Sequence, residues 1–342
     1  MTAMLRNFWY LAFSGRALKH GKTRPVTLLG EQMLLGRRYD DSVFAVIDVC
    51  PHRGMPMRHG SFDGTTLRCC YHGWAFDSAG GACTEIPSLA PDEAIDPARF
   101  RLKTWPCQEV QGNIWVFVGD KTPTDGPPTV PGFECQPPQV TTTMRFPCGV
   151  DLAAMGFFDP GHPAFVHTSK WWKSNPASKL RLKEKEFEPA GMGFRMLRHH
   201  LKHGANPYRL LGRDVHIDIG ITLPGIRIEH IQGSAHSACV LAAATPISET
   251  ETDVHYCVYW TPKWLAPLKP FATWMAKDFL DQDRVVAVRM MDNPSLPAPM
   301  FVGGADTQVR WYLRLKKEYQ DAAAENRPFA NPLRPTTLRW RS

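Results

Sequence analysis

The sequence lacks three features that would identify common classes of protein. No apolar run reaches the roughly 18 residues of a transmembrane helix, and the N-terminal segment has no signal-peptide core or cleavage site. The formal net charge of +7 is not gathered into a dense basic run, which argues against nucleic-acid binding. A glycine-rich phosphate loop and strand–helix alternation are missing, which argues against a Rossmann domain. We therefore expect a cytoplasmic protein with neither a membrane nor a nucleic-acid partner.

Cysteine is also scarce. Nine cysteines in 342 residues, an odd number, are too few for a disulfide scaffold. Most of them show no metal-binding spacing, and we expect these to be small side chains packed in the interior: Cys83, Cys107, Cys135, Cys148, Cys239 and Cys257.

The remaining composition predicts two parts of different architecture. Thirty prolines and 26 glycines predict many turns. Short β-rich segments fill the first 120 residues, and a proline-rich stretch, 123–138, follows as the expected linker. In the second part, the hydrophobic pattern predicts several strands within 194–260 and two late helices, at 270–291 and 306–324. The expected fold class is α+β, with an N-terminal all-β domain and a C-terminal antiparallel sheet flanked by helices.

Two short loops carry the most specific motif. The first reads Cys50-Pro-His52, and the second reads Cys69-Cys-Tyr-His72. A glycine follows each histidine within two residues, so the backbone can pass close to a bound metal. Two thiolates and two imidazoles suit tetrahedral zinc. They also suit a Rieske [2Fe–2S] cluster, in which two cysteines bind one iron and two histidines bind the other.

The order of the ligands separates these two interpretations. Zinc fingers commonly carry two cysteines on one arm and two histidines on the other, whereas each loop here carries one of each. The mixed order favours a Rieske cluster bound by Cys50, His52, Cys69 and His72. Cys70 is not expected to be a ligand, because adjacent side chains of an extended segment point to opposite faces. We expect Cys70 to be a small packed residue.

A second set of potential ligands follows the proline-rich stretch. Asp159, His162 and His167 lie in the segment Asp-Pro-Gly-His-Pro-Ala-Phe-Val-His. One distorted helical turn would bring both histidines to the same side. A mononuclear non-haem iron binds two histidines and one carboxylate, with positions left open for dioxygen. Asp159 could be that carboxylate, or it could accept the N–H of a histidine and fix its tautomer.

With both motifs in this order, the chain resembles the α subunit of the Rieske non-haem iron oxygenases over nearly its whole length. It is most similar to the shorter, single-subunit branch that includes vanillate O-demethylase and dicamba monooxygenase. The resemblance implies a Rieske domain at 1–120 and a catalytic domain at 121–342. It also implies that the antiparallel sheet of the catalytic domain is of the helix-grip type.

The resemblance further implies that the third iron ligand is an aspartate in a late helix. Asp283 matches best, because an arginine and two valines follow it, and Asp278 and Asp281 are the fallback positions. Gln282 stands where the family commonly has an acidic residue, and we expect no effect of this difference on iron binding.

The same resemblance implies a role for each residue. His162, His167 and Asp283 are the expected Fe(II) ligands. Asp159 is expected to link the cluster histidine His72 of one subunit to His162 of the next in a homotrimer. A separate reductase, with or without a ferredoxin, would supply electrons from NAD(P)H, because the sequence has no flavin or nicotinamide motif. The implied activity is O2-dependent hydroxylation or oxidative O- or N-demethylation of a hydrophobic aromatic or polycyclic molecule.

The substrate pocket is harder to predict. We expect it to be lined by residues 195–260 and by the loop after His167, in which Trp171 and Trp172 are adjacent. The alternating isoleucines of 219–228 would turn one face toward an apolar cavity. Candidate polar anchors are His199, His200, His203, His230 and His255.

Two other functions are compatible with these residues. A Rieske electron carrier, or a degenerate homologue without mononuclear iron, would contain about two irons per chain, whereas the oxygenase would contain about three. A zinc-binding interaction module would contain zinc and would show no visible absorption.

Overall fold

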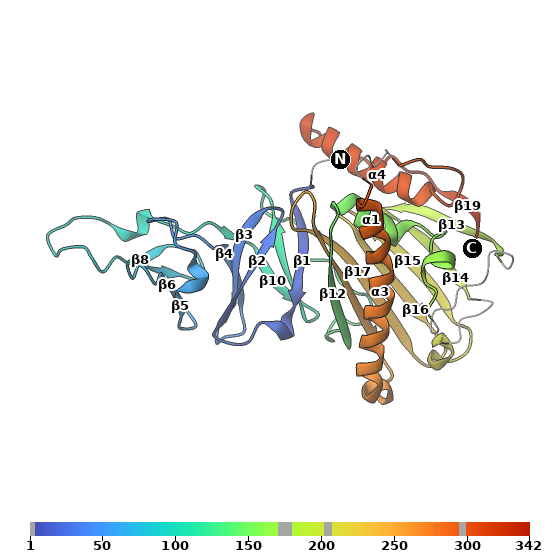
Figure 1. Ribbon diagram of the computed structural model, residues 1–342, viewed down its shortest axis with the longest axis horizontal. Helices are drawn as coiled ribbons and strands as arrows, with labels where there is room; N and C mark the ends of the chain where they lie inside the picture. The colour runs from blue at the N-terminus through green and yellow to red at the C-terminus, as the bar shows by residue number, and fades with distance from the viewer. Residues whose placement is uncertain (1–3, 170–179, 202–206, 294–298) are drawn as a thin grey trace. The chain divides into compact units, whose positions relative to one another are not determined.

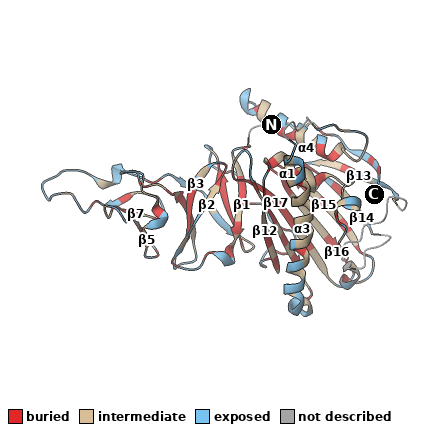
Figure 2. Cartoon of the chain, viewed as in Figure 1, coloured by how far each residue is buried: buried red, intermediate tan, exposed pale blue. Residues whose placement is uncertain are grey.

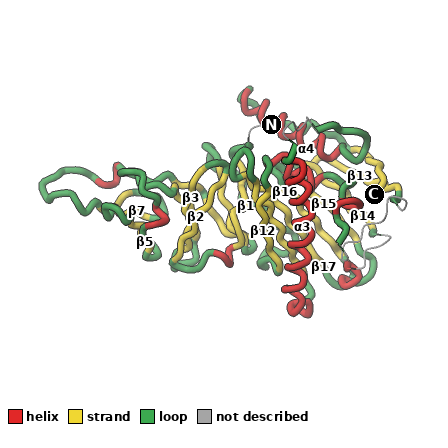
Figure 3. Tube along the Cα trace, viewed as in Figure 1, coloured by secondary structure: helices red, strands yellow, loops and turns green. Residues whose placement is uncertain are grey.

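The chain divides into two compact units. The computed structural model in Figure 1 describes residues 4–169, 180–201, 207–293 and 299–342. One unit spans residues 6–129, and residues 130–342 make up nearly all of the other. The first unit consists mainly of strands and loops, and the second combines a large sheet with helices (Figure 3). This arrangement confirms the predicted α+β class. Among the described residues, no helix combines the length and apolarity needed to cross a bilayer.

The first unit contains three small sheets, with strand orders β1-β11-β10, β2-β3-β4-β9 and β5-β6-β7-β8. Its strands are β1 (Phe8–Ser14), β2 (Lys22–Leu28), β3 (Glu31–Arg37), β4 (Val43–Ile47), β5 (Ser61–Phe62), β6 (Thr66–Arg68), β7 (Ala75–Asp77), β8 (Cys83–Glu85), β9 (Thr104–Trp105), β10 (Cys107–Val110) and β11 (Asn113–Val118). Every residue of β11 is buried, because this apolar strand lies between two neighbours.

The second unit is built on one antiparallel sheet in the order β12-β18-β17-β16-β15-β14-β13-β19. Its strands are β12 (Val140–Phe146), β13 (Leu182–Ala190), β14 (Gly193–His200), β15 (His216–Thr222), β16 (Ile226–Gln232), β17 (Ser237–Pro246), β18 (Thr252–Trp260) and β19 (Thr336–Arg341). Burial alternates along β15, as expected for a strand with one face against the interior.

In the described part of the chain, four α-helices accompany this sheet. They are α1 (Val150–Phe158), α2 (Pro163–Val166), α3 (Lys269–Met291) and α4 (Thr307–Ala324). The shorter 3-10 helices within the described ranges are η1 (Gly15–Ala17), η2 (Met57–His59), η3 (Pro97–Arg99), η5 (Pro207–Leu211) and η6 (Lys263–Leu268). α3 packs against β12, and α1 contacts β17, α3 and α4. Ala276, Leu280 and Ala287 of α3 are buried, and Figure 2 shows most of the helix at intermediate burial, with exposed residues mainly toward its ends.

A proline ends α1. Asp159 follows the helix and has extended backbone angles, φ −87° and ψ 109°. The residue before a proline is sterically disfavoured in the helical region, so Pro160 forces the chain out of the helix. This turn leads the chain directly from α1 into α2.

All nine cysteines are free thiols. Cys83, Cys148, Cys239 and Cys257 are buried, as expected, and Cys107 is partly buried. The prediction was wrong for Cys70 and Cys135, which are exposed. Cys70 follows the buried Cys69 in a tight turn, and two successive side chains of such a turn cannot both point inward.

A buried ion pair joins α1 to α4. Lys316 is 1% exposed, and its Nζ donates to Asp151 Oδ1 at 2.6 Å. We expect Asp151→Ala to lower the free energy of unfolding by about 3–5 kcal/mol, because the mutation strips the buried ammonium group of its carboxylate. Scanning calorimetry would measure this loss as a lower transition temperature of residues 130–342. The double variant Asp151→Leu, Lys316→Met should recover most of the stability. An unchanged transition in Asp151→Ala would contradict the prediction.

Candidate functional site

The two loops of the first motif are built alike. One follows β4 and the other follows β6. The Gly54 N–H donates to the Cys50 carbonyl oxygen at 2.9 Å, and the Gly73 N–H donates to the Cys69 carbonyl oxygen at 3.1 Å. Gly54 and Gly73 have φ values of +73° and +74°, a conformation that side chains disfavour. The glycine after each histidine therefore closes the turn that exposes the two ligand side chains on one side.

The two loops bring the four side chains together. The thiols of Cys50 and Cys69 are buried and share a hydrogen bond. The rings of His52 and His72 lie with their centroids 4.6 Å apart. The indole of Trp74 stacks on His52 at 4.7 Å and covers that imidazole.

This set of donors fits an iron–sulfur cluster. Burial, with a smaller effect of the neighbouring Cys69, raises the pKa of Cys50 to about 11. Burial and the charge of His72 lower the pKa of His52, whose Nδ1 has no hydrogen-bond partner in the described part of the chain. Thiols bind metals as thiolates, and a buried imidazole nitrogen without a partner is unfavourable unless a group such as a metal binds it. Two thiols facing two imidazoles match the ligand set of a Rieske centre, and the ligand roles remain predictions.

In the second unit, a single helical turn separates the two histidines of the second motif. His162 is the N-cap of α2, and His167 directly follows its last residue. Pro163 occupies the first helical position, where its missing N–H leaves no hydrogen bond unmade. The ring centroids of His162 and His167 lie 5.3 Å apart. The turn thus places both imidazoles on the same side.

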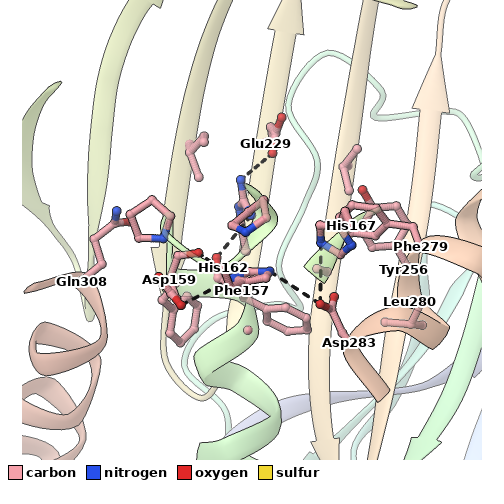
Figure 4. Close-up of a pocket in the computed structure, with 18 of the residues that line it drawn as sticks. Phe157, Asp159, His162, His167, Glu229, Tyr256, Phe279, Leu280, Asp283 and Gln308 are labelled. Carbon is pink, nitrogen blue, oxygen red and sulfur yellow. Dashed lines mark hydrogen bonds and ion pairs between the residues drawn. The ribbon is translucent and has the colours of Figure 1, made fainter. Parts of the chain in front are cut away.

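Asp283 of α3 joins the two histidines. Its Oδ1 lies 3.5 Å from His162 Nε2 and 3.6 Å from His167 Nε2. One ligand atom from each of the three residues lies within 4.8 Å of the others, and Figure 4 shows the side chains converging. Asp278 and Asp281 instead accept hydrogen bonds from side chains of their own helix.

The electrostatics of this group fit a divalent cation. Burial, with a smaller effect of the His162 charge, lowers the pKa of His167 to about 4, so its imidazole is neutral at pH 7. Burial raises the pKa of Asp283 to about 6, against the opposing charge of His162. Within the described residues, neither ring nitrogen of His167 has a hydrogen-bond partner. Two imidazoles and one carboxylate are the donor set of a mononuclear non-haem iron site.

Asp159 lies beside this group rather than within it. Its backbone carbonyl oxygen accepts the Nδ1–H of His162 at 2.8 Å, which leaves the lone pair on Nε2, toward Asp283. Its carboxylate accepts the Gly161 N–H at 2.7 Å and lies 3.7 Å from the same Nδ1. Burial raises the pKa of Asp159, but the hydrogen bonds from His162 and Gly161 outweigh this effect and hold the pKa below its ordinary value. The main chain therefore fixes the His162 tautomer, and the carboxylate retains capacity for another partner.

One positioning residue was not recognised in the sequence. Gln282 Oε1 accepts the backbone N–H of Thr168 at 3.0 Å, and its Nε2 donates to the Asp278 carboxylate at 3.0 Å. Thr168 follows His167, and Gln282 precedes Asp283. The amide therefore ties together the two segments that carry these potential ligands. No pattern in the sequence signals a contact between residues so far apart.

We expect Gln282→Leu to weaken iron binding by about 10–100-fold, because the Thr168 N–H loses the acceptor that holds the His167 loop to α3. Gln282→Glu keeps an acceptor and should retain most of the iron. Iron per chain after dialysis against a weak chelator would measure the effect. The reduced cluster signal in electron spin resonance is the internal control and should not change. Equal iron loss in the two variants would refute the role of the acceptor.

A cavity of about 310 Å³ opens beside the His–His–Asp group, and Ile219 is among the residues that line it. The described histidines that were predicted as anchors do not line it: His199, His200, His230 and His255. His203, Trp171 and Trp172 fall outside the described residues. Other polar residues line the cavity, and the sequence analysis missed them. They include Glu229, Tyr256 and Gln308 (Figure 4), together with Lys183, Tyr208 and Arg227.

Comparisons with known proteins agree with both units. A model of the Rieske [2Fe-2S] domain matches residues 8–106. The chain is 37% identical over 133 residues to the 4beta-methylsterol monooxygenase of Methylococcus capsulatus, with 38% of this chain and 36% of that protein covered. It is 32% identical over 167 residues to the oxygenase component of dicamba O-demethylase from Stenotrophomonas maltophilia, with 48% of each covered. The matches thus span about a third to a half of the length of these curated relatives.

The similarity to solved structures extends over nearly the whole chain. The crystal structure of dicamba monooxygenase bound to dicamba aligns with a TM-score of 0.73 and 23% identity, over 94% of this chain and 100% of the other. This match shows that the two chains share a fold. Together with the Rieske domain model and the matched oxygenase sequences, it confirms the predicted resemblance. The chain therefore contains a Rieske domain, and in sequence and fold it is similar to Rieske oxygenase α subunits such as dicamba monooxygenase.

Proposed function

We propose that the chain is a terminal oxygenase component. It would use a Rieske cluster and a mononuclear Fe(II) to oxidise a hydrophobic aromatic or polycyclic molecule with O2, by hydroxylation or oxidative O- or N-demethylation. One observation carries the proposal: His162, His167 and Asp283 converge at a cavity of about 310 Å³, in a chain that also contains a Rieske domain. The size of the cavity suits a small organic substrate.

Each unit would hold one of the two metal centres. We assign the cluster, with Cys50, His52, Cys69 and His72 as ligands, to residues 1–120, and the iron to residues 121–342. The change between the compact units, at residue 129, supports a division within the proline-rich stretch.

The residues of the second unit can hold, orient and shield the iron. Bound Fe(II) would supply the activation of O2, with electrons from the cluster. The Asp159 carbonyl oxygen orients His162 through its Nδ1–H. The ring of Phe279 stacks on His167 with centroids 3.8 Å apart and keeps water from that face of the imidazole. The cavity then places an apolar substrate beside the remaining open side.

The proposed partners follow from what the chain needs. A separate reductase, with or without a ferredoxin, would deliver the electrons, because the sequence contains no flavin or nicotinamide motif. A homotrimer would place Asp159 near the cluster of a neighbouring subunit. The nine free thiols suit a reducing compartment, and we place the protein in the cytoplasm.

Metal analysis combined with oxygen uptake tests the proposal. We expect about three irons per chain, a Rieske signal on reduction, and O2 consumption coupled to product when a surrogate reductase and aromatic ethers or polycycles are added. About two irons and no product would favour the electron carrier or degenerate homologue. Zinc without a cluster signal would favour the interaction module.

A further inference from the structure

The sheet side of the cavity carries a compact group of polar side chains. Arg227 and Glu229 are two residues apart on β16, so they share one face of the sheet. The strand register places Ala242 beside Arg227 and Tyr256 beside Ala242, across three adjacent strands. Tyr208, from η5, lines the same cavity. We refer to Arg227, Glu229, Tyr208 and Tyr256 as the polar cluster.

Within the polar cluster, the arginine charge is already balanced. Arg227 Nη2 donates to Glu229 Oε2 at 2.6 Å, and its Nη1 donates to the Phe157 carbonyl oxygen at 3.2 Å. In the described part of the chain, no hydrogen bond reaches the second carboxylate oxygen of Glu229. The Nε–H of Arg227 is buried and has no hydrogen-bond partner among the described residues. The pair therefore offers a ligand one acceptor and one further donor, while the charge of Arg227 is balanced by Glu229.

The two tyrosines offer donors. Burial raises the pKa of Tyr256, and the charges of Glu229 and Asp283 raise it further. Burial and then the Glu229 charge also raise the pKa of Tyr208 well above its ordinary value. Both phenols therefore keep their O–H at neutral pH. Tyr256 lines the same cavity as Glu229 and Asp283.

The other charged groups around the cavity do not favour an anion. Asp159 and Asp283 add negative charge on the helix side. Lys183 lies on β13, three strands away from Glu229 on β16, and desolvation lowers the pKa of its ammonium group. A substrate carboxylate beside Glu229 would have to displace a 2.6 Å ion pair or remain buried without a cation, and both alternatives are unfavourable.

We infer that the cavity selects an uncharged, mainly apolar substrate bearing a group that both donates and accepts hydrogen bonds, such as a carboxamide, a lactam or a hydroxyl group. Glu229 accepts from this group, Tyr208 and Tyr256 donate to it, and these residues determine specificity. The inference rests on the proposed function, since it assigns the substrate class of the same cavity.

Equilibrium binding to the metal-loaded protein tests this inference without turnover. In anaerobic calorimetric titrations with no reductase, we expect 3-methoxybenzamide to bind at least about tenfold more tightly than 3-methoxybenzoate. Glu229→Gln should reverse the preference. The new amide would donate where the carboxylate accepted, and the Arg227 charge would no longer be balanced. Binding of the benzoate should then strengthen about tenfold, and binding of the benzamide should weaken.

Two further variants serve as a control and as an independent test. Glu188→Gln is the matched control, because Glu188 pairs with Arg195 on the same sheet without lining the cavity, and the preference should not change. Tyr256→Phe leaves the ion pair intact and should weaken benzamide binding about tenfold. It therefore gives an answer even if Glu229→Gln does not fold.

The inference is overturned by tighter binding of the benzoate to the wild-type protein, by binding of neither probe, or by an unchanged preference in Glu229→Gln. It is also overturned if Lys183→Met shows the benzoate to be bound through Lys183. These outcomes differ from failure of the proposed function. Selective binding of the benzamide without oxygen uptake would contradict the proposed oxygenase activity and would still support the inferred substrate class. Efficient oxidation of carboxylate substrates would support the oxygenase activity and contradict the inferred substrate class.

Discussion

Replacing Asp283 by alanine is expected to lower the iron content from about three to about two per chain and to reduce product formation by at least about 100-fold. The carboxylate supplies the negative charge of the His–His–Asp group, with its Oδ1 3.5–3.6 Å from both imidazoles. Without it, the two imidazoles alone are a weak site for Fe(II). Iron analysis and product quantification with a surrogate reductase measure both effects.

The same helix provides the control for this experiment. Asp281 is half-exposed and pairs with Arg284 one turn along α3, away from the histidines. Asp281→Ala should keep about three irons and nearly full turnover. The reduced cluster signal should be identical in both variants, because the cluster ligands lie in the other unit. Retention of the third iron by Asp283→Ala would show that another group completes the site.

The features that could be predicted from the sequence are those formed within short segments. The two cluster loops and the turn of α2 each place their ligands within about six residues, so spacing and residue type are sufficient. Asp283 is different, because it lies 116 residues after His167 and was identified only through the family resemblance. The structure supplies what the spacing could not, a helix that carries this carboxylate to the histidines.

The position of the polar cluster in the cavity could not be predicted from the sequence. The alternation of β16 predicts that Arg227 and Glu229 share a face, but it does not predict which face borders the cavity. That depends on the register of β16 with β17 and β18, which is set by pairing between distant segments. The sequence analysis named only histidines as candidate anchors and did not consider Arg227 or Glu229, since charged side chains commonly lie on the surface. The positioning role of Gln282 was missed for a similar reason, since its hydrogen-bond partner Thr168 lies 114 residues away in the sequence.

Asp159→Asn is expected to separate metal binding from electron delivery. His162 is oriented by the backbone carbonyl oxygen of Asp159, at 2.8 Å from Nδ1, and this group survives the substitution. The variant should therefore retain about three irons per chain. The Asp159 side chain is about one-third exposed, and its carboxylate uses one oxygen for the Gly161 N–H, so the other can accept from a group of a second subunit. An asparagine side chain would replace that negative charge with a neutral amide.

If Asp159 links the cluster of one subunit to the iron of the next, turnover should fall at least about 10–100-fold in Asp159→Asn while both metal sites stay loaded. Rapid mixing of the reduced protein with substrate and O2 would locate the defect. The cluster should reoxidise slowly in the variant and quickly in the wild-type protein. Loss of the third iron would instead show that the carboxylate supports His162 directly. Full turnover with both metals present would rule out a bridging role, and the exposed Asp159 carboxylate would then have no part in carrying electrons between the two centres.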